Sequence, residues 1–223
     1  MAEGPAAARD EVAALLSMMQ RVLGREHPDT LTTRSELAKL TGEAGDAAGA
    51  RDQYAALLPV LARLLGRDHP DTLAAWSELA RWTGEAGDAA AARDQFAALL
   101  SVRERILGPV HRRTLAARSN LAHWTGEAGD PQAARDEYAK LVPLYELEFG
   151  PGHPRTLSVR ASLAAWVGAA GDGAEASKHF EALVRTYERT LGPKHPDTLA
   201  AEENLTFWSK QAGTHRRWWT RRS

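Results

Sequence analysis

The stretch His27-Pro28-Asp29-Thr30-Leu31 decides the fold, because it returns four more times along the 223-residue chain. The later copies are His69-Pro-Asp-Thr-Leu73, His111-Arg-Arg-Thr-Leu115, His153-Pro-Arg-Thr-Leu157 and His195-Pro-Asp-Thr-Leu199, and successive copies begin 42 residues apart. A motif that recurs at a fixed period of this size is typical of a repeat protein, in which each unit packs on its neighbours. The repeat therefore sets the register in which every other residue is interpreted.

Each repeat predicts two helices, named here helix A and helix B. Helix A of the first complete repeat is expected over about residues 29–41, because Pro28 suits the first helical turn and Asp29 lies favourably near the positive end of the helix dipole. Helix B is expected over about residues 47–65, with its apolar residues on one side at helical spacing. The chain is thus predicted to be all-α.

Glycine, aspartate and proline mark where these helices end or bend. In the link Thr41-Gly-Glu-Ala-Gly-Asp46, Gly45 suits the left-handed conformation that ends a helix, and Asp46 suits the N-cap of the next one. A link this short makes helices A and B antiparallel. Pro59 and Pro143 fall inside B helices, and each should kink or locally unwind its helix.

The register divides the chain into half repeats, complete repeats and a basic segment. The divisions are a half repeat at 1–26, complete repeats at 27–68, 69–110, 111–152 and 153–194, a half repeat at 195–213, and the segment 214–223. About ten helices are expected: a lone B helix, four A–B pairs and a lone A helix.

Composition excludes several classes of function. The chain has no cysteine, which excludes disulfides and thiolate chemistry, and its net charge of −1 argues against a nucleic-acid-binding surface along the whole chain. No apolar run is long enough to span a membrane, and the N-terminus lacks a secretory signal, so a cytoplasmic protein is expected. Glycine-rich nucleotide motifs and the Gly-x-Ser-x-Gly motif are absent, so no cofactor, metal or enzymatic activity is predicted.

Five residues of the third repeat carry a resemblance to a known family. Leu121, Ala122, Gly129, Ala134 and Tyr138 stand where tetratricopeptide repeats have their small and large consensus residues. The chain resembles that family, and the 42-residue period with its His-Pro-Asp-Thr-Leu start resembles the kinesin light chain subtype, which also occurs in bacteria. Abundant Ala and Gly with few lysines suit a bacterial source.

The resemblance implies a right-handed superhelical solenoid whose A helices line a concave groove. Such grooves bind peptides or protein segments without chemistry of their own. Two departures from the family pattern limit what carries over. Thr41 and its equivalents replace the usual aromatic residue near the end of helix A, and the Asn that holds ligand backbone in kinesin-type grooves appears only at Asn120 and Asn204.

Two repeated features are interpreted as structural. A tryptophan near the end of four A helices (Trp82, Trp124, Trp166 and Trp208) is expected to form core between repeats, with a ligand-stacking surface as the alternative. A glycine in the last turn of helix A, such as Gly42, indicates a close approach by the neighbouring tryptophan. The repeated histidines are expected to be loop or cap residues, because A helices lie too far apart for a shared metal site.

The variable residues on helix A are the candidate binding site. The predicted groove residues are Ser35, Lys39, Ser77, Arg81, Ser119, Asn120, His123, Asn204 and Phe207. They make the groove basic and hydroxylic at its N-terminal end and apolar at its C-terminal end, which would suit an acidic peptide with an apolar anchor. The alternative is a solvated face on which Lys39 and Arg81 pair with Glu43 and Glu85.

The two ends of the chain leave further alternatives open. The lone B helix and the lone A helix could dock head to tail between copies, or the chain could be a piece of a longer array, such as the sensor arm of a bacterial signalling NTPase. The segment 214–223 carries Arg216, Arg217, Arg221 and Arg222 with Trp218 and Trp219. It is expected to cap the last A helix, with contact to anionic lipid as the alternative, and no nucleic-acid partner is expected. The preferred interpretation is a protein–protein interaction scaffold.

Overall fold

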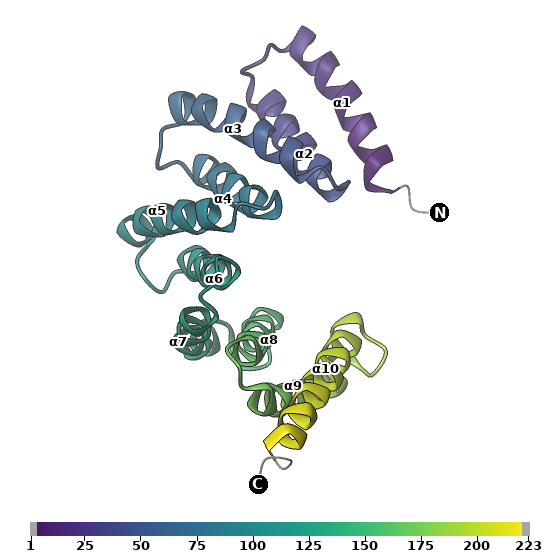
Figure 1. Ribbon diagram of the computed structural model, residues 1–223. Coiled ribbons are helices and arrows are strands. Elements are labelled where there is room, and N and C mark those ends of the chain that lie inside the picture. The colour runs from purple at the N-terminus through teal and green to yellow at the C-terminus, as the bar shows by residue number, and fades with distance from the viewer. Residues whose placement is uncertain (1–3, 220–223) are drawn as a thin grey trace. The chain divides into compact units, whose positions relative to one another are not determined.

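The computed structural model describes residues 4–219, and for Pro5 and residues 213–219 it describes the backbone alone. This part of the chain forms ten α-helices and no strand (Figure 1). The helices are α1 (Pro5–Val22), α2 (Pro28–Glu43), α3 (Ala47–Leu64), α4 (Pro70–Glu85), α5 (Ala89–Leu107), α6 (Arg112–Glu127), α7 (Pro131–Phe149), α8 (Pro154–Ala169), α9 (Gly173–Leu191) and α10 (Pro196–Trp219). The predicted all-α repeat fold is confirmed, with the even-numbered helices as A helices and the odd-numbered ones as B helices.

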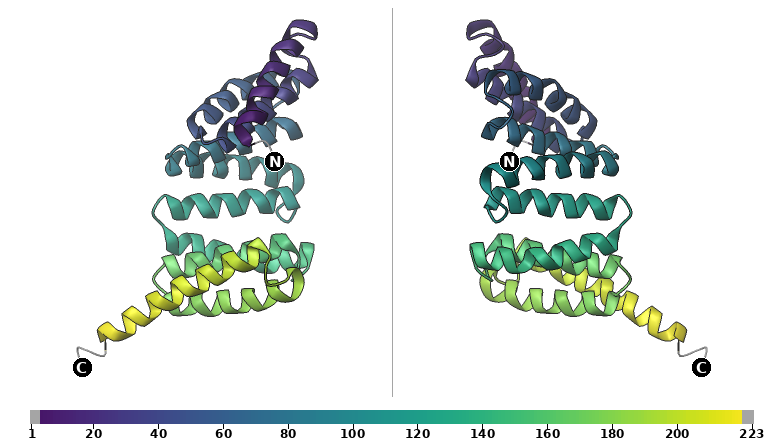
Figure 2. Two further views of the ribbon diagram at one scale, coloured as in Figure 1. Left: turned by 90° about the vertical axis from the view of Figure 1, so that its right-hand side faces the viewer. Right: turned by 90° about the vertical axis from the view of Figure 1, so that its left-hand side faces the viewer.

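The helices fall into two compact units, each described by itself. The N-terminal unit ends at Gly108 and contains α1 to α5, and the C-terminal unit begins at Pro109 and contains α6 to α10. Within each unit every helix packs on the next, and neighbouring A helices also touch, as α8 and α10 do (Figure 2). Each unit is therefore a stack of antiparallel helices in which A helices follow one another on the same side.

The repeated pentapeptide works as a helix start. His27 is the N-cap of α2, and its Nδ1 accepts a hydrogen bond from the backbone N–H of Asp29 at 3.3 Å. The other four histidines make the same bond at 3.1–3.2 Å. The interpretation of these histidines as cap residues is confirmed. The Nδ1 atom of each histidine thus serves the backbone at the start of an A helix.

The threonine and leucine of the pentapeptide fasten several of the A helices to the preceding turn, although the buried hydroxyl of Thr30 in α2 has no hydrogen-bond partner. The buried hydroxyl of Thr72 donates to the carbonyl of Gly66 at 2.8 Å, and Thr156 does the same to Gly150. Leu73 is buried in the core, as are its equivalents in α2, α6 and α8. The pentapeptide therefore closes the turn between repeats by hydrogen bonding and by burial at once.

The link between helices A and B also follows the prediction. Gly45 has φ +99°, and Asp46 is the N-cap of α3, accepting from the N–H of Gly49 at 2.8 Å. Of the two effects predicted for Pro59 and Pro143, local unwinding does not occur, because α3 and α7 run through these prolines without a break, and a kink stays a prediction. Both prolines are exposed, so the carbonyls that lose a helical partner lie on the solvent side of the helix.

Candidate binding surface on the A helices

The tryptophans are core between neighbouring A helices, as predicted. Trp82 and Trp124 are 5 % and 6 % exposed, and Trp166 and Trp208 are half-buried. A Cβ placed on Gly42 would lie 2.2 Å from Cη2 of Trp82, and Gly126 and Gly168 stand in the same relation to Trp166 and Trp208. The glycines therefore admit the indole rings between adjacent A helices, which makes the rings part of the packing rather than a stacking surface.

Two of the three predicted serines, Ser35 and Ser119, bond to buried tyrosines. Tyr54 donates from its hydroxyl to the carbonyl of Ser35 at 2.9 Å, and the Ser35 hydroxyl donates to the same phenol at 3.4 Å. Ser119 stands between two phenols: Tyr138 donates to its carbonyl at 2.9 Å, and its hydroxyl lies 3.0 Å from that of Tyr145. Burial raises the pKa of Tyr138 to about 12. These serine groups thus complete the core.

The predicted cations of the N-terminal unit are paired within their own helices. Lys39 Nζ lies 4.0 Å from Glu36 and 3.8 Å from Glu43, and Arg81 donates to Glu78 at 2.7 Å. The Arg81 guanidinium also lies 3.8 Å from the ring centroid of Trp82, a cation–π contact. These pairings resemble the solvated-face alternative, although Arg81 pairs with Glu78 instead of Glu85.

The remaining predicted residues, apart from Ser77, lie in the C-terminal unit. His123 on α6 packs edge-on against Trp124 and Trp166, with ring centroids 4.8 Å and 6.0 Å away. Phe207 on α10 is 52 % exposed, and Asn204 donates its side-chain amide to the carbonyl of Ala200. Ser77 on α4 and Asn120 on α6 are half-buried. The nine predicted residues are thus divided between the two units, and each unit is considered by itself.

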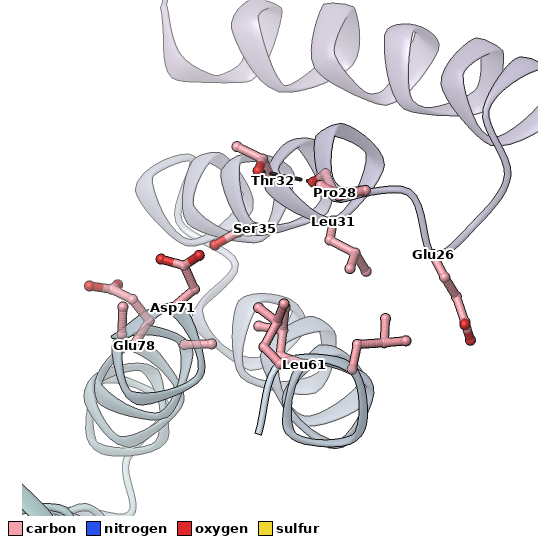
Figure 3. Close-up of a pocket in the computed structure, with 12 residues that line it drawn as sticks. Glu26, Pro28, Leu31, Thr32, Ser35, Leu61, Asp71 and Glu78 are labelled. Carbon is pink, nitrogen blue, oxygen red and sulfur yellow. Dashed lines mark hydrogen bonds between the residues drawn. The ribbon is translucent and has the colours of Figure 1, made fainter. Parts of the chain in front are cut away.

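A pocket of about 450 Å³ opens in the N-terminal unit between α2, α3 and α4 (Figure 3). Its apolar lining includes Leu31 of α2, Leu61 and Leu64 of α3, and Ala74 and Ala75 of α4. Three carboxylates, those of Glu26, Asp71 and Glu78, also line it, together with Ser35. We call this the N-terminal pocket. Of its lining, Ser35 alone belongs to the predicted site.

A second pocket of about 460 Å³ lies in the same register in the C-terminal unit, between α8, α9 and α10. Its lining residues Pro154, Ser158, Ala161, Tyr187, Asp197 and Ala201 each follow a lining residue of the N-terminal pocket by three repeat lengths. We call this the C-terminal pocket. The repeated structure therefore builds a pocket between neighbouring A helices in each unit, over the end of the B helix that joins them.

One signal in the sequence could have indicated these pockets. Leu64 and Leu65 come at the end of helix B and are 40 % and 41 % exposed, although Leu65 was expected to belong to the buried side of that helix. This end of helix B lies beside the start of the next A helix. Exposed apolar side chains are unusual in a turn that faces solvent. The predicted site consisted of residues from the middle and end of helix A and therefore did not include these leucines.

The profiles of known families decide the classification of the chain. Two descriptions of the tetratricopeptide repeat match, one over residues 85–147 and one over residues 30–71 and 156–197, which together span well over half of the chain. The chain belongs to the tetratricopeptide repeat family. The predicted membership of this family is confirmed, and the bacterial source stays a prediction. Proteins with tetratricopeptide repeats generally mediate protein–protein interaction.

Solved structures of other tetratricopeptide repeat proteins share this fold. A Podosopora anserina kinesin light chain-like protein with nearly identical repeats has a TM-score of 0.71 at 26 % identity, over 86 % of this chain and 90 % of that one. BtubC (BKLC) from P. vanneervenii has a TM-score of 0.74 at 20 % identity, over 95 % of this chain and 85 % of that one. MamA has a TM-score of 0.55 at 16 % identity, over 83 % of this chain and 94 % of that one. The comparison with curated proteins found no match.

The first and last helices of the tetratricopeptide array, α1 and α10, each expose a leucine that is buried in the equivalent helices. Leu199 of α10 is 46 % exposed, whereas its equivalents in the four other A helices are at most 5 % exposed. Leu15 of α1 is 47 % exposed, whereas its equivalents in the four other B helices are at most 4 % exposed. Each leucine occupies the position that in a complete repeat is covered by the partner helix.

The described residues of this tetratricopeptide repeat chain include neither a membrane-spanning helix nor a metal-binding cluster. None of the described helices has the length and hydropathy that crossing a membrane requires. Among the same residues, no three histidine, aspartate or glutamate side chains gather closely enough to hold a metal ion. The prediction that 214–223 caps the last A helix concerns side chains outside the described part of the chain.

Proposed function

We propose that this chain is an interaction scaffold that binds a peptide or protein segment along the exposed face of its A helices. The observation that carries the proposal is the pair of pockets, of about 450 and 460 Å³, that open at the same register between neighbouring A helices in each unit. Concave sites of this size with apolar linings and a few polar groups are the usual binding sites of proteins. An extended segment crossing the A helices could place one apolar side chain in such a pocket.

Polar groups beside each pocket would orient such a segment. Ser35 and Asp71 flank the N-terminal pocket, and Asn204 and Asp197 flank the C-terminal one. Specific interfaces combine an apolar centre with a polar rim in this way. The proposal therefore assigns binding energy to the pocket interiors and orientation to the residues around them.

The prediction of an acidic ligand stays a prediction. Lys39 and Arg81 already contact Glu36, Glu43 and Glu78, so a ligand carboxylate would compete with those intrahelical pairs. Exposed pairs of this type are weak, at about 0–1 kcal/mol each, so competition is feasible, but it lowers the gain from an acidic ligand.

Site-specific photocrosslinking tests the proposed surface. A photoreactive amino acid is placed at Thr32 or Ala74 beside the N-terminal pocket, and at exposed Ala97 or Ala139 on B helices as matched controls. In an extract of the source organism, we expect crosslinked partners from the pocket positions and few from the controls. Equal crosslinking from both sets would refute binding on the A-helix face.

A second candidate is head-to-tail self-assembly, which the exposure of Leu15 and Leu199 favours. Docking α10 of one copy on α1 of another would cover both leucines. However, Thr206 of α10 stands where the four other A helices have an alanine that is at most 1 % exposed. The contact between α10 and α1 of another copy would therefore pack less closely than the contact between helices A and B of a complete repeat. We expect any assembly in sedimentation velocity to be weak and to be lost in Leu199→Glu. A strict monomer at high protein concentration would dismiss this candidate.

A further inference from the structure

The C-terminal pocket has a phenol at the position where the N-terminal pocket has a leucine. Tyr187 of α9 lines the C-terminal pocket, and Leu61, three repeat lengths earlier, lines the N-terminal one. Both side chains are buried, with 6 % of each residue exposed. The two pockets therefore match in size and register but differ in chemistry, because a phenol can form hydrogen bonds at a place where the other pocket is apolar.

The hydroxyl of Tyr187 lacks the partner that its equivalent has one repeat earlier. The Tyr145 hydroxyl lies 3.0 Å from that of Ser119, but Ala161 stands at the position of Ser119 in the last complete repeat. The Tyr187 hydroxyl makes no hydrogen bond with any residue that the structure describes. Ala161 also lines the C-terminal pocket, so the missing serine leaves the phenol open to a group bound there.

The phenol of Tyr187 is available as a hydrogen-bond donor. Burial, and next the carboxylate of Asp197, raise the pKa of Tyr187 above its usual value, so the hydroxyl keeps its proton at neutral pH. A polar group that is buried without a hydrogen bond is destabilising, and a ligand that supplies an acceptor removes this cost. Tyr187 should therefore favour a ligand with an acceptor atom in the C-terminal pocket.

The charged residues of the C-terminal pocket favour a neutral ligand group. Arg155 of α8 and Asp197 of α10 both line it, so the pocket presents one cation and one carboxylate. The Asp197 side chain is 59 % exposed and can accept a hydrogen bond, but it would repel a ligand carboxylate beside Tyr187. Arg155 would likewise repel a ligand cation. A neutral group that accepts from the phenol and donates to Asp197 meets neither repulsion.

We propose that the C-terminal pocket binds the side-chain carboxamide of an asparagine or glutamine in the bound segment. The carboxamide oxygen accepts from the Tyr187 hydroxyl, and the NH2 group donates to the carboxylate of Asp197. A backbone amide points its carbonyl and its N–H in opposite directions because the peptide bond is trans, whereas a side-chain carboxamide carries both at one end. The inference rests on the proposed function, because it names the side chain that one A-helix pocket accepts.

Three small probes of similar size test the inference on the full chain. Benzamide carries a carboxamide, benzoate a carboxylate and benzylamine an ammonium group, each attached to one aromatic ring. The chain is labelled with 3-fluorotyrosine, and fluorine NMR follows its four tyrosines, which single tyrosine-to-phenylalanine variants assign. We expect benzamide to shift the Tyr187 signal saturably, with a Kd at least about threefold lower than that of either charged probe.

Two variants identify the groups that hold the carboxamide. Ala161→Ser restores the serine that bonds to the phenol one repeat earlier, so it should occupy the Tyr187 hydroxyl and raise the benzamide Kd about threefold or more. Asp197→Asn should also raise that Kd about threefold and should strengthen benzoate binding, because the repulsion is removed. Asp71→Asn, the same change in the N-terminal pocket, is the matched control and should leave the Tyr187 titrations unchanged. Circular dichroism checks that each variant is folded.

The outcomes separate this inference from the proposed function. Tighter binding of benzoate or benzylamine would overturn the carboxamide as the preferred group. A Tyr187 signal that benzamide does not shift, or a benzamide Kd unchanged by Ala161→Ser, would overturn the phenol as the donor. If any of these results is found while Thr32 and Ala74 still crosslink a partner, the scaffold function stands and only this inference is rejected. Failure of both experiments would reject both proposals.

Discussion

Replacing Gly42 with alanine tests the contact that joins neighbouring A helices. Gly42 lies in the last turn of α2, where helix propensity alone favours alanine by about 1 kcal/mol. A Cβ at this position would lie 2.2 Å from Cη2 and 2.4 Å from Cζ2 of Trp82. The substitution therefore sets a local gain in propensity against a collision in the core, and the sign of its effect on stability reports which is larger.

The collision should be the larger effect. Trp82 is 5 % exposed, so its ring cannot move into solvent without opening the core. Overpacking a close-packed interior costs about 1–3 kcal/mol, so Gly42→Ala should lower the free energy of unfolding by up to about 2 kcal/mol after the propensity gain. Trp82→Ala alone should cost about 3–5 kcal/mol. In that background the collision is gone, and Gly42→Ala should stabilise by about 1 kcal/mol.

Urea denaturation of the four proteins in this double-mutant cycle measures the coupling, which should be about 1–3 kcal/mol. Far-UV circular dichroism is the appropriate signal, because Trp82→Ala alters the fluorescence. Gly49→Ala in the first turn of α3 is the control. A Cβ there would meet only the exposed carboxylate of Asp46, and the equivalent aspartates still cap their helices beside Ala91 and Ala133 in the next two repeats. If Gly42→Ala stabilises as Gly49→Ala should, or if the cycle shows no coupling, the reasoning about the indole contact is refuted.

Three further predictions concern the cap, the core and the cations. His153→Ala should lower the free energy of unfolding by about 1 kcal/mol because α8 loses its cap, whereas His153→Asn should retain most of it, as thermal denaturation would show. Burial raises the pKa of Tyr138 from 10.0 to about 12, so its contribution to stability is complete below pH 10 and is lost as pH rises through 12. Urea titrations of Tyr138→Phe should lack this alkaline loss. Lys39→Ala combined with Arg81→Ala should change partner affinity less than about threefold, because both cations are already paired. A tenfold loss of affinity would show instead that these two cations contact the ligand.

Local chemistry in the sequence was enough to predict the helices and their ends. The cap at His27, the left-handed Gly45 and the N-cap Asp46 each depend on residues within three positions of one another. The approach of Trp82 to Gly42 was also predictable, because the repeat places a large residue opposite a small one in the next A helix. The histidine cap occurs five times and the Gly-Asp link four times in one register, so the agreement between copies compensates for the weakness of each signal.

Contacts within the binding face were harder to predict. Ser35 was expected to face a ligand, yet its hydroxyl and carbonyl bond to Tyr54, which lies 19 residues away on the next helix. Arg81 was expected to be an open cation, yet Glu78 and the Trp82 ring hold it. In both cases several partners were within reach of the side chain, and the packing of the helices selected among them.

The sequence by itself determined the repeat length, the order of A and B helices and the residues that start, end and join them. Only the tertiary structure decided where the surface is hollow, because the N-terminal pocket is built by α2, α3 and α4 together and includes leucines at the end of helix B that the packing leaves exposed. Helix boundaries follow from hydrogen bonds between residues that are close along the chain. A pocket depends on which side chains the neighbouring helices leave uncovered, and that depends on how three helices pack.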